Sequence, residues 1–135
     1  NSEINQMLKK FTNKEINFTF TPHLTPMFRG IMSTIYIDLE NGITQSKVIK
    51  ELSNFYKKDN FIKILKADSL ISTDDVINTN NCIISVCKSK YKNKIIILSV
   101  IDNLVKGAAG QAIQNMNIMM NYEETDGLNL VPLAP

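Results

Sequence analysis

The chain has 135 residues, of which 44% are hydrophobic and 21% charged, values that are ordinary for one globular domain with a single buried core. Its formal net charge is only +2 and its lysines are scattered, so neither nucleic acid nor an anionic membrane is expected as a partner. No apolar run approaches the roughly 20 residues of a membrane span, and the N-terminus shows no signal-peptide pattern. We therefore expect a cytoplasmic protein.

Residues 2–12 are predicted to form the first helix. Its apolar side chains recur at three- and four-residue steps, which places four of them on one face: Ile4, Met7, Leu8 and Phe11. Residues 16–20 then alternate between apolar and polar side chains, a pattern typical of a half-buried strand. Pro22 and Pro26 interrupt regular pairing and should bracket a loop.

The predicted loop between Phe20 and Ile31 contains the only histidine and the only arginine of the chain, His23 and Arg29. The planar guanidinium of arginine has a donor geometry that matches carboxylate and phosphate groups. The structural alternative is that both residues are solvated surface side chains, which is the commoner fate of a single cation in a loop.

A second alternation, over residues 31–39, predicts a longer strand that ends at the turn-forming pair Asn41-Gly42. Thr44 is then expected to cap a helix over residues 44–59, because threonine is a favoured residue at helix N-termini. The helical spacing gives this segment an apolar inner face with lysines outside: Val48, Leu52, Phe55 and Tyr56.

Further strands complete the predicted sheet. Residues 61–65 favour a strand, residues 67–75 a polar loop, and the run 76–89 contains another strand. A turn at 91–93 then leads into the isoleucine-rich run 93–102, and such alternation on both sides of a short turn indicates an antiparallel pair. The order of elements predicts an α+β fold, with a mixed, largely antiparallel sheet and helices on one face.

The two cysteines, Cys82 and Cys87, lie in one predicted strand at an odd separation, which sends them to opposite faces and argues against a disulfide. Free cysteine is often a buried small hydrophobe, and no histidine is near either residue in sequence to activate its thiol. One histidine and two cysteines on one strand do not supply a metal site. We therefore predict no catalytic residue and no metal ligand in this chain.

The stretch 102–121 continues the last strand into a helix. Apolar residues recur along it at helical spacing: Val105, Ala109, Ala112, Ile113, Met116 and Met120. Gly107, Ala108 and Gly110 leave its first two turns almost without side chains, at a cost of roughly 1 kcal/mol for each glycine. A chain accepts that cost where another backbone or a flat ligand comes close, and tight helix packing is the simpler explanation.

Three segments carry a resemblance to a known enzyme family: FTPHLTPMFRGI at 20–31, VIDNLVKGAAGQAIQNMN at 100–117 and GLNLVPLAP at 127–135. They resemble the C-terminal half of the N-acetyl-gamma-glutamyl-phosphate reductases, NADPH-dependent enzymes of arginine biosynthesis that are relatives of aspartate-semialdehyde dehydrogenase. The resemblance covers nearly the whole chain. It implies the catalytic and dimerisation domain of a glyceraldehyde-phosphate-dehydrogenase-like architecture, with a homo-oligomer as the expected assembly.

The chemistry of that family needs parts that this sequence lacks. In such enzymes a cysteine thiolate attacks an acyl phosphate, and NADPH delivers hydride to the resulting thioester. The resemblance places the nucleophilic cysteine, a histidine and the nucleotide-binding domain upstream of residue 1, so the chain alone is expected to be inactive. Residues 1–101 would be the remaining part of the catalytic and dimerisation domain, residues 102–121 a helix that packs on the nucleotide domain, and residues 122–135 an irregular tail.

The resemblance also implies binding roles. Asn103 matches the asparagine that orients the nicotinamide carboxamide of NADP, and Gly107 would lie at the close approach to the cofactor. Arg29 and His23 would face the acyl phosphate substrate, which carries both a carboxylate and a phosphate. The structural alternative is that Asn103 simply caps the helix, since Asn and Asp are favoured at that position. Both roles can hold at once, because capping uses the side-chain oxygen and leaves the amide donors free.

Two alternatives stay open at this point. An aspartate-semialdehyde dehydrogenase would share the fold and the chemistry but act on aspartyl phosphate, and segments 20–31 and 127–135 favour the acetylglutamyl enzyme over it. The second alternative is a free-standing, non-catalytic dimerisation or binding module. The sequence that precedes Asn1 in the gene would separate these readings.

Overall fold

The structure, a computed structural model, describes residues 2–12 and 16–132. Within these ranges its elements follow one another in this order: α1 (Ser2–Phe11), β1 (Ile31–Asp38), α2 (Gln45–Phe55), β2 (Ile62–Ile64), η1 (Thr73–Asp75), β3 (Cys82–Lys88), β4 (Lys94–Ile101), η2 (Val105–Ala109) and α3 (Gly110–Met119). The short η1 is a 3-10 helix, whereas η2 is a stretch of π-helix that leads directly into α3.

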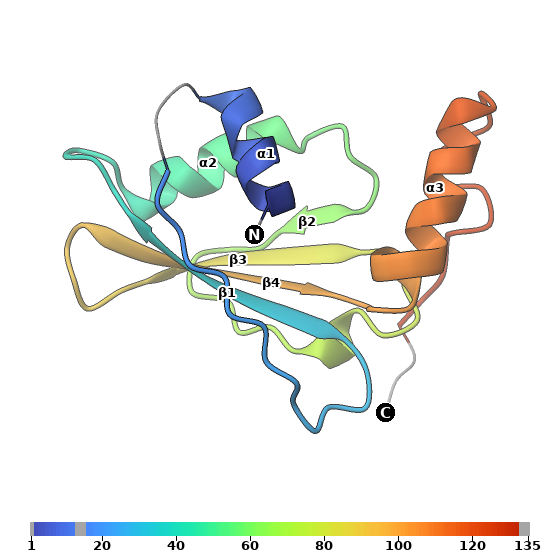
Figure 1. The fold of residues 1–135 in the computed structure, drawn as a ribbon, viewed down its shortest axis with the longest axis horizontal. Coiled ribbons are helices and arrows are strands. Elements are labelled where there is room, and N and C mark those ends of the chain that lie inside the picture. The colour runs from blue at the N-terminus through green and yellow to red at the C-terminus, as the bar shows by residue number, and fades with distance from the viewer. Residues whose placement is uncertain (1, 13–15, 133–135) are drawn as a thin grey trace.

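The strands form one mixed sheet in the order β1-β4-β3-β2. Strand β4 pairs antiparallel with both β1 and β3, whereas the short β2 runs parallel to β3. The three α-helices lie on one side of this sheet, and the connection from β2 to β3, which includes η1, lies on the other (Figure 1). The predicted α+β fold, with its largely antiparallel sheet and helices on one face, is confirmed.

The best buried part of the molecule lies between β3, β4 and the β2–β3 connection. Ile83 and Val100 stand opposite each other in the ladder, where branched side chains pack well on the pleated surface. They pack with three residues of the connection: Leu65, Ile71 and Val76. The same row continues across the sheet to Met32 on β1, but Met32 is 41% exposed. The core therefore covers the middle of the sheet and stops short of β1.

Helix α2 covers the opposite face of the sheet near β2 and β3. It begins as predicted, because the Thr44 hydroxyl accepts a hydrogen bond from Lys47 N at 3.3 Å. The buried Gln45 side chain then donates its amide to the carbonyl oxygen of Val86 at 2.8 Å. This contact fixes the first turn of α2 on β3.

Two predictions made from the sequence are wrong. Residues 16–20 form no strand, because their alternation supplies a pattern but no neighbouring strand to satisfy the backbone groups. Phe55 does not face inward: it is the last residue of α2, and its ring packs edge-on against Tyr56 with 4.9 Å between the centroids. The other predicted helices and strands are all present.

Both cysteines lie on β3 and are free, as predicted, but they are half-buried rather than buried. Cys82 Sγ lies 3.4 Å from Ser99 Oγ, and Cys87 Sγ lies 3.7 Å from Ser85 Oγ. Each thiol therefore sits beside a serine hydroxyl, on opposite faces of the strand as the pleat requires.

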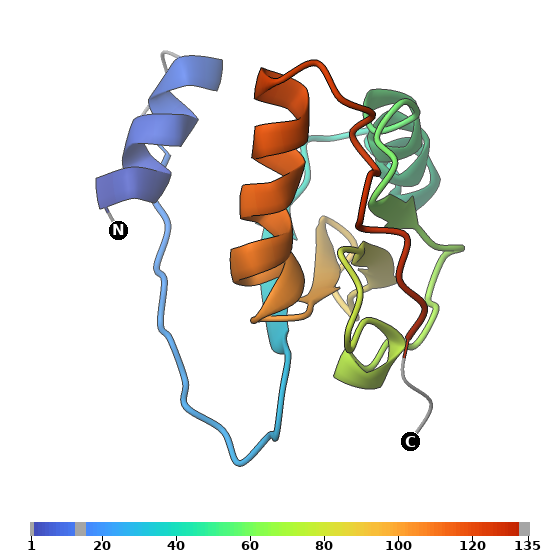
Figure 2. The same ribbon diagram turned by 90° about the vertical axis from the view of Figure 1, so that its right-hand side faces the viewer.

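The described residues before β1 add little to the core. The segment 16–30 descends from α1 and returns to β1 as an open excursion, and α1 stands apart from the other helices (Figure 2). Phe11 of α1 is exposed, and Leu24 and Phe28 of the excursion are almost fully exposed. The described residues therefore leave most of the apolar stripe predicted for α1 uncovered, since Ile4, Met7 and Phe11 are all exposed.

Helix α3 also exposes apolar side chains. It rises from one end of the sheet, and its predicted apolar stripe meets solvent at Ile113, Met116 and Met120, each of which is more than a third exposed. The adjoining side of the helix, with Gly110 and Asn117, is buried against the body of the molecule. No helix in the described ranges is long and apolar enough to cross a membrane.

Strand β1 is an edge of the sheet and carries apolar side chains on both faces. Ile31, Ile35 and Tyr36 are exposed together with Met32, and the outer edge presents unpaired backbone groups that can pair with another chain. Exposed apolar areas beyond a few hundred Å² are rare on soluble monomers. This strand is the strongest candidate for contact with a second copy.

We expect the 135-residue chain to self-associate, because pairing along β1 would cover both the apolar side chains and the free backbone groups. Light scattering should give a mass above the 15.3 kDa of one chain. Ile35→Lys places a charge in the middle of the edge strand and should shift the mass toward that of the monomer. Met116→Lys, in the exposed apolar stripe of α3, tests the other apolar surface. A wild-type monomer at high micromolar concentration would contradict this expectation.

Candidate functional site

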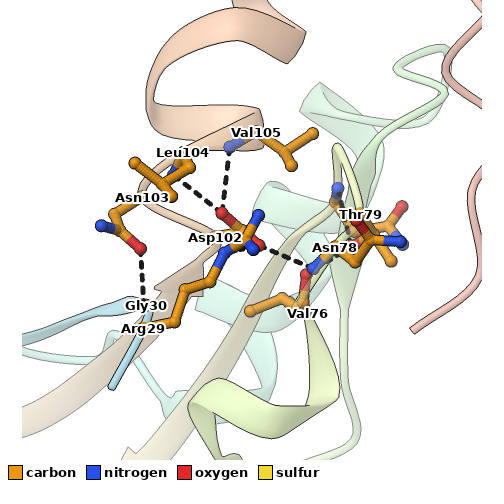
Figure 3. Close-up of polar contacts among 10 residues, drawn as sticks. Arg29, Gly30, Val76, Asn78, Thr79, Asp102, Asn103, Leu104 and Val105 are labelled. Carbon is orange, nitrogen blue, oxygen red and sulfur yellow. Dashed lines mark hydrogen bonds and ion pairs between the residues drawn. The ribbon is translucent and has the colours of Figure 1, made fainter. Parts of the chain in front are cut away.

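Side chains continue the β1–β4 ladder beyond its last backbone pair, which joins Ile31 to Ile101. Immediately past that pair, Arg29 Nε lies 2.9 Å from Asp102 Oδ2 and forms an ion pair with it. This contact ties the end of the 20–31 loop to the residue that follows β4. Figure 3 shows the polar groups that surround it.

The neighbouring residues make a second contact between the same two segments. Gly30 N donates a hydrogen bond to Asn103 Oδ1 at 2.8 Å (Figure 3). Gly30 has a φ of +103°, and a Cβ there would lie 2.6 Å from Thr73 Cβ, so glycine is required on both counts. We refer to the following residues as the Asp102 junction: 29, 30, 78 and 102–105.

Asp102 is completely buried, and its carboxylate finds its partners within the protein. Oδ1 accepts hydrogen bonds from Leu104 N at 2.7 Å and Val105 N at 2.9 Å, which are the first donors of the following helix. Oδ2 accepts a hydrogen bond from Asn78 N at 2.6 Å and also faces Arg29. One carboxylate therefore joins the 20–31 loop, the β2–β3 connection and the start of the C-terminal helix.

The pKa of Asp102 reflects two opposed effects. Burial, the largest of them, raises the pKa because a charged carboxylate loses its hydration. The three backbone N–H donors and the Arg29 guanidinium stabilise the charged form, and together they outweigh burial and lower the pKa below its ordinary value. The carboxylate is therefore ionised at neutral pH.

Arg29 contacts Asp102 through Nε alone. Its side chain is 21% exposed, and among the described residues its two terminal nitrogens have no hydrogen-bond partner. A guanidinium that is held through Nε and free at its far end presents a pair of donors. That geometry suits a carboxylate or a phosphate.

Asn103 does not cap the helix, which was the structural alternative for this residue. The capping oxygen belongs to Asp102, one residue earlier, and the Asn103 oxygen accepts the Gly30 N–H instead. Because a backbone N–H can bond only to the oxygen of the amide, the Asn103 Nδ2 group is turned away from Gly30. Within the described ranges Nδ2 has no partner. Its donors are available to a ligand, although for a different reason from the one predicted.

The helix after Asp102 begins with unusually wide turns. Gly107 N donates to the carbonyl oxygen of Asp102 at 2.8 Å, and Ala109 N donates to that of Leu104 at 3.1 Å. Such π-helical turns are rare and are often found at functional sites. Gly107 is exposed, and the nearest atom to a Cβ added there would lie 3.4 Å away. The helix surface at Gly107 is bare rather than crowded.

Gly110 has the opposite surroundings. It is buried, and a Cβ there would lie 2.5 Å from Asn80 Oδ1 and 2.7 Å from Val105 Cγ1. Tight packing, the simpler of the two explanations for the glycines of this helix, therefore holds at Gly110. It does not hold at Gly107.

A polar network holds the buried side of α3. Gln114 Oε1 accepts hydrogen bonds from Asn80 Nδ2 at 2.8 Å and from Lys106 Nζ at 2.7 Å, and Gln114 Nε2 donates to Glu124 Oε1 at 2.6 Å. Burial lowers the pKa of Lys106, and nearby negative groups compensate only in part. The helix is thus fixed at its start by Asp102 and in its middle by Gln114.

Three of the four predicted site residues come together at this end of the sheet. Arg29, Asn103 and Gly107 are all joined to the Asp102 junction by the contacts above. His23 is exposed, and its ring Nδ1 lies 3.0 Å from the Thr21 carbonyl oxygen. The structure gives His23 no hydrogen bond to the other three.

The family model of the semialdehyde dehydrogenase dimerisation domain matches residues 1–103. The chain belongs to this family. N-acetyl-gamma-glutamyl-phosphate reductases of Thermoanaerobacter pseudethanolicus and Desulfotalea psychrophila are 44% and 47% identical to it over 98% of the chain. The chain spans only 39% and 38% of the length of these two relatives. The family resemblance predicted from the three sequence segments is confirmed.

A solved structure matches the semialdehyde dehydrogenase domain at the level of the fold. Aspartate semialdehyde dehydrogenase II of Vibrio cholerae, complexed with ASA, has a TM-score of 0.53 and 19% sequence identity. The match covers 71% of this chain and 28% of the other. At this identity the likeness supports the α+β architecture alone.

The residue that organises this end of the semialdehyde dehydrogenase domain, Asp102, was not singled out from the sequence. The available signal was an ionisable side chain placed directly after an isoleucine-rich strand and before a helix. Among the described residues no group of histidine, cysteine and carboxylate side chains could hold a metal ion, and neither thiol hydrogen-bonds to an imidazole. The arrangement can hold an anion and orient an amide, but it offers no activated nucleophile.

Asp102→Asn should destabilise the chain at neutral pH by about 1–3 kcal/mol, because an amide cannot accept from every donor that the carboxylate satisfies. A depressed pKa contributes stability that is complete above the ordinary pKa of about 3.9 and is lost as the pH falls through the folded-state value. The difference in unfolding free energy between wild type and variant should therefore shrink below about pH 4.

Denaturant unfolding at a series of pH values measures this difference. The pKa of Asp68 is also lowered, chiefly by the Lys88 backbone N–H, and it acts in the same pH range. Because both proteins retain Asp68, the comparison isolates Asp102. A gap between them that did not change with acidification would count against a charged Asp102 in the folded state.

Gly110→Ala and Gly107→Ala form a matched pair. Gly110→Ala should cost about 1–3 kcal/mol, because its methyl group would overlap Asn80 and Val105 in a packed region. Gly107→Ala should be neutral or stabilising by up to about 1 kcal/mol, since alanine favours the helix and the nearest atom is at contact distance. Equal effects of the two substitutions on unfolding would refute the distinction drawn between these glycines.

Proposed function

We propose that the chain is part of a longer NADP-dependent N-acetyl-gamma-glutamyl-phosphate reductase, which converts N-acetyl-glutamyl 5-phosphate to N-acetyl-glutamate 5-semialdehyde in arginine biosynthesis. The relatives that carry this name are 44–47% identical over 98% of the chain, and they support the proposal. Residues 1–101 then belong to the catalytic and dimerisation domain, and the cytoplasm is the expected location. The nucleophilic cysteine and the histidine of the reaction come from outside this chain.

The observation that carries the substrate role is the free end of the Arg29 guanidinium beside a buried carboxylate. Asp102 neutralises part of the arginine charge but leaves both terminal nitrogens for a further anion. The substrate carries a carboxylate and a phosphate, and either group fits this pair of donors. His23 lies on the same loop and is proposed as a secondary contact to the substrate.

The residues present also fit a nicotinamide cofactor. The Asn103 amide has free donors, which suit the oxygen of a carboxamide, and Gly107 leaves a bare helix surface on which a flat ring can approach. NADPH, when bound, supplies the hydride of the reduction. The role of Asn103 and Gly107 is to orient the ring and let it come close.

The uncovered apolar surfaces fit the same proposal. The exposed stripe of α3, with Ile113, Met116 and Met120, would pack on the nucleotide-binding domain of the longer protein. The exposed β1 strand would lie toward a second subunit of a homo-oligomer, as the dimerisation domain of the family name suggests. The proposal thus assigns one partner to each surface: the nucleotide-binding domain to α3 and a second subunit to β1.

The full-length protein should oxidise NADPH when N-acetyl-glutamyl 5-phosphate is added and much more slowly with aspartyl phosphate. Arg29→Lys should raise KM for the acyl phosphate about tenfold, because a single ammonium cannot hold Asp102 and also make a bidentate contact with the substrate. Steady-state rates with each substrate varied in turn measure this effect. No turnover by the wild-type protein would argue for a non-catalytic module instead.

Gly107→Ala is the control for Arg29→Lys, because it should affect the cofactor and not the substrate. The fold should tolerate it, and its methyl group should raise KM for NADPH while leaving KM for the acyl phosphate near the wild-type value. If both variants raised the same KM, the assignment of Arg29 to substrate and Gly107 to cofactor would fail.

A further inference from the structure

Arg29 and Asn103, which are proposed to bind the substrate and the cofactor, are held by two neighbouring contacts. Arg29 is tied to Asp102, and the next residue, Gly30, is tied to Asn103 (Figure 3). Continued past Ile31 and Ile101, the antiparallel register of β1 and β4 would pair Gly30 with Asp102 and Arg29 with Asn103. The two contacts instead run diagonally to that register, and together they tie both residues of one segment to both residues of the other.

The carboxylate at the centre has little freedom to move alone. Asp102 is completely buried, and Oδ1 is occupied by the N–H groups of Leu104 and Val105, which open the helix. Oδ2 is occupied by Asn78 N and Arg29 Nε. A displacement of Arg29 therefore acts on the carboxylate, and a displacement of the carboxylate acts on the helix start next to Asn103.

The hydrogen bond from Gly30 is a second connection between the same two segments. Gly30 has a φ of +103°, and Thr73 fills the space beside it, so the backbone at Gly30 has little room to move. The Gly30 N–H, which fixes the Asn103 oxygen, therefore keeps its position only while the end of the 20–31 loop keeps its own. Order in this loop and orientation of the Asn103 amide depend on each other.

We infer that Asp102 is a positioning residue that couples anion binding at Arg29 to nicotinamide binding at Asn103, so that each ligand increases the affinity for the other. The inference rests on the proposed function for the identity of the two ligands. An anion on the terminal nitrogens fixes Arg29 and, through Asp102, the helix start that carries Asn103. Because coupling between two binding equilibria is reciprocal, the cofactor must strengthen anion binding by the same factor.

The test measures NADP⁺ binding to the full-length protein by calorimetry, with and without saturating N-acetyl-L-glutamate as the anionic probe. The wild-type Kd for NADP⁺ should fall at least about fivefold when the probe is present, the lower end of typical coupling between sites. The reverse titration, probe into protein with and without NADP⁺, should give the same ratio.

Asp102→Asn tests the role of the carboxylate. Its one remaining side-chain oxygen can still cap the helix, but its amide nitrogen would face the Asn78 N–H and Arg29 Nε, which are both donors. We expect the ratio of the two Kd values to fall to about one while each ligand still binds. A merely structural loss would weaken binding in both conditions and leave the ratio unchanged.

Asp38→Asn is the matched control. Asp38 forms an ion pair with Lys94 at the opposite end of the same two strands, where both side chains are exposed. This variant removes the same charge from the β1–β4 pair without touching the junction, so its ratio should remain that of the wild type. Loss of coupling in both variants would overturn the assignment to Asp102.

Hydrogen exchange on the wild-type protein keeps the inference testable should Asp102→Asn fail to fold. The probe alone should slow exchange at residues 103–107, and NADP⁺ alone should slow exchange at residues 21–30. If both ligands bind but neither protects the other's segment, and the Kd ratio is one, coupling is refuted while the proposed function stands. If the wild-type protein binds neither ligand, the proposed function itself is refuted.

Discussion

A carboxylate without access to water must obtain its hydrogen bonds from the protein, and this constraint at Asp102 organises one end of the molecule. Its partners come from three segments that are distant in sequence: the end of the 20–31 loop supplies an ion pair, and the connection before β3 and the start of the C-terminal helix supply hydrogen-bond donors. The carboxylate is satisfied only when all three are in place. The candidate site is therefore a product of the complete fold and not of any one element.

One side of the C-terminal helix packs against the protein, and the other side is open to a ligand. On the buried side, Gly110 and Gln114 leave no spare room, and the helix is fixed against Asn80. On the open side, Gly107 is bare and the Asn103 amide keeps its donors unused within the described ranges. Groups that are packed on one side and open on the other are suited to ligand binding, because the fold positions them while their free side can contact a ligand.

Periodicity in the sequence predicted the elements that bury a face, such as the β3–β4 pair and the Thr44-capped helix, because burial imposes the repeat. It failed at residues 16–20, where alternation has no partner strand, and at Phe55, where helical spacing reaches past the sheet. Capping was considered for Asn103 and not for Asp102, although both residue types suit that position equally. The burial of Asp102 and its ion pair with Arg29 determine which of the two residues caps the helix, and neither is visible in a single sequence.

The pairing of β1 with β4 has a consequence for the time course of folding. β1 is made before the other strands of this sheet, but its partner residues, from Lys94 to Ile101, follow after the whole of α2, β2 and β3. At the ribosome's pace of about 5–20 residues per second, the first strand would wait for several seconds with its isoleucines unpaired. Sheet closure is thus a late, long-range event that ends the vulnerable period of the nascent chain, and the Asp102 junction can lock only after it.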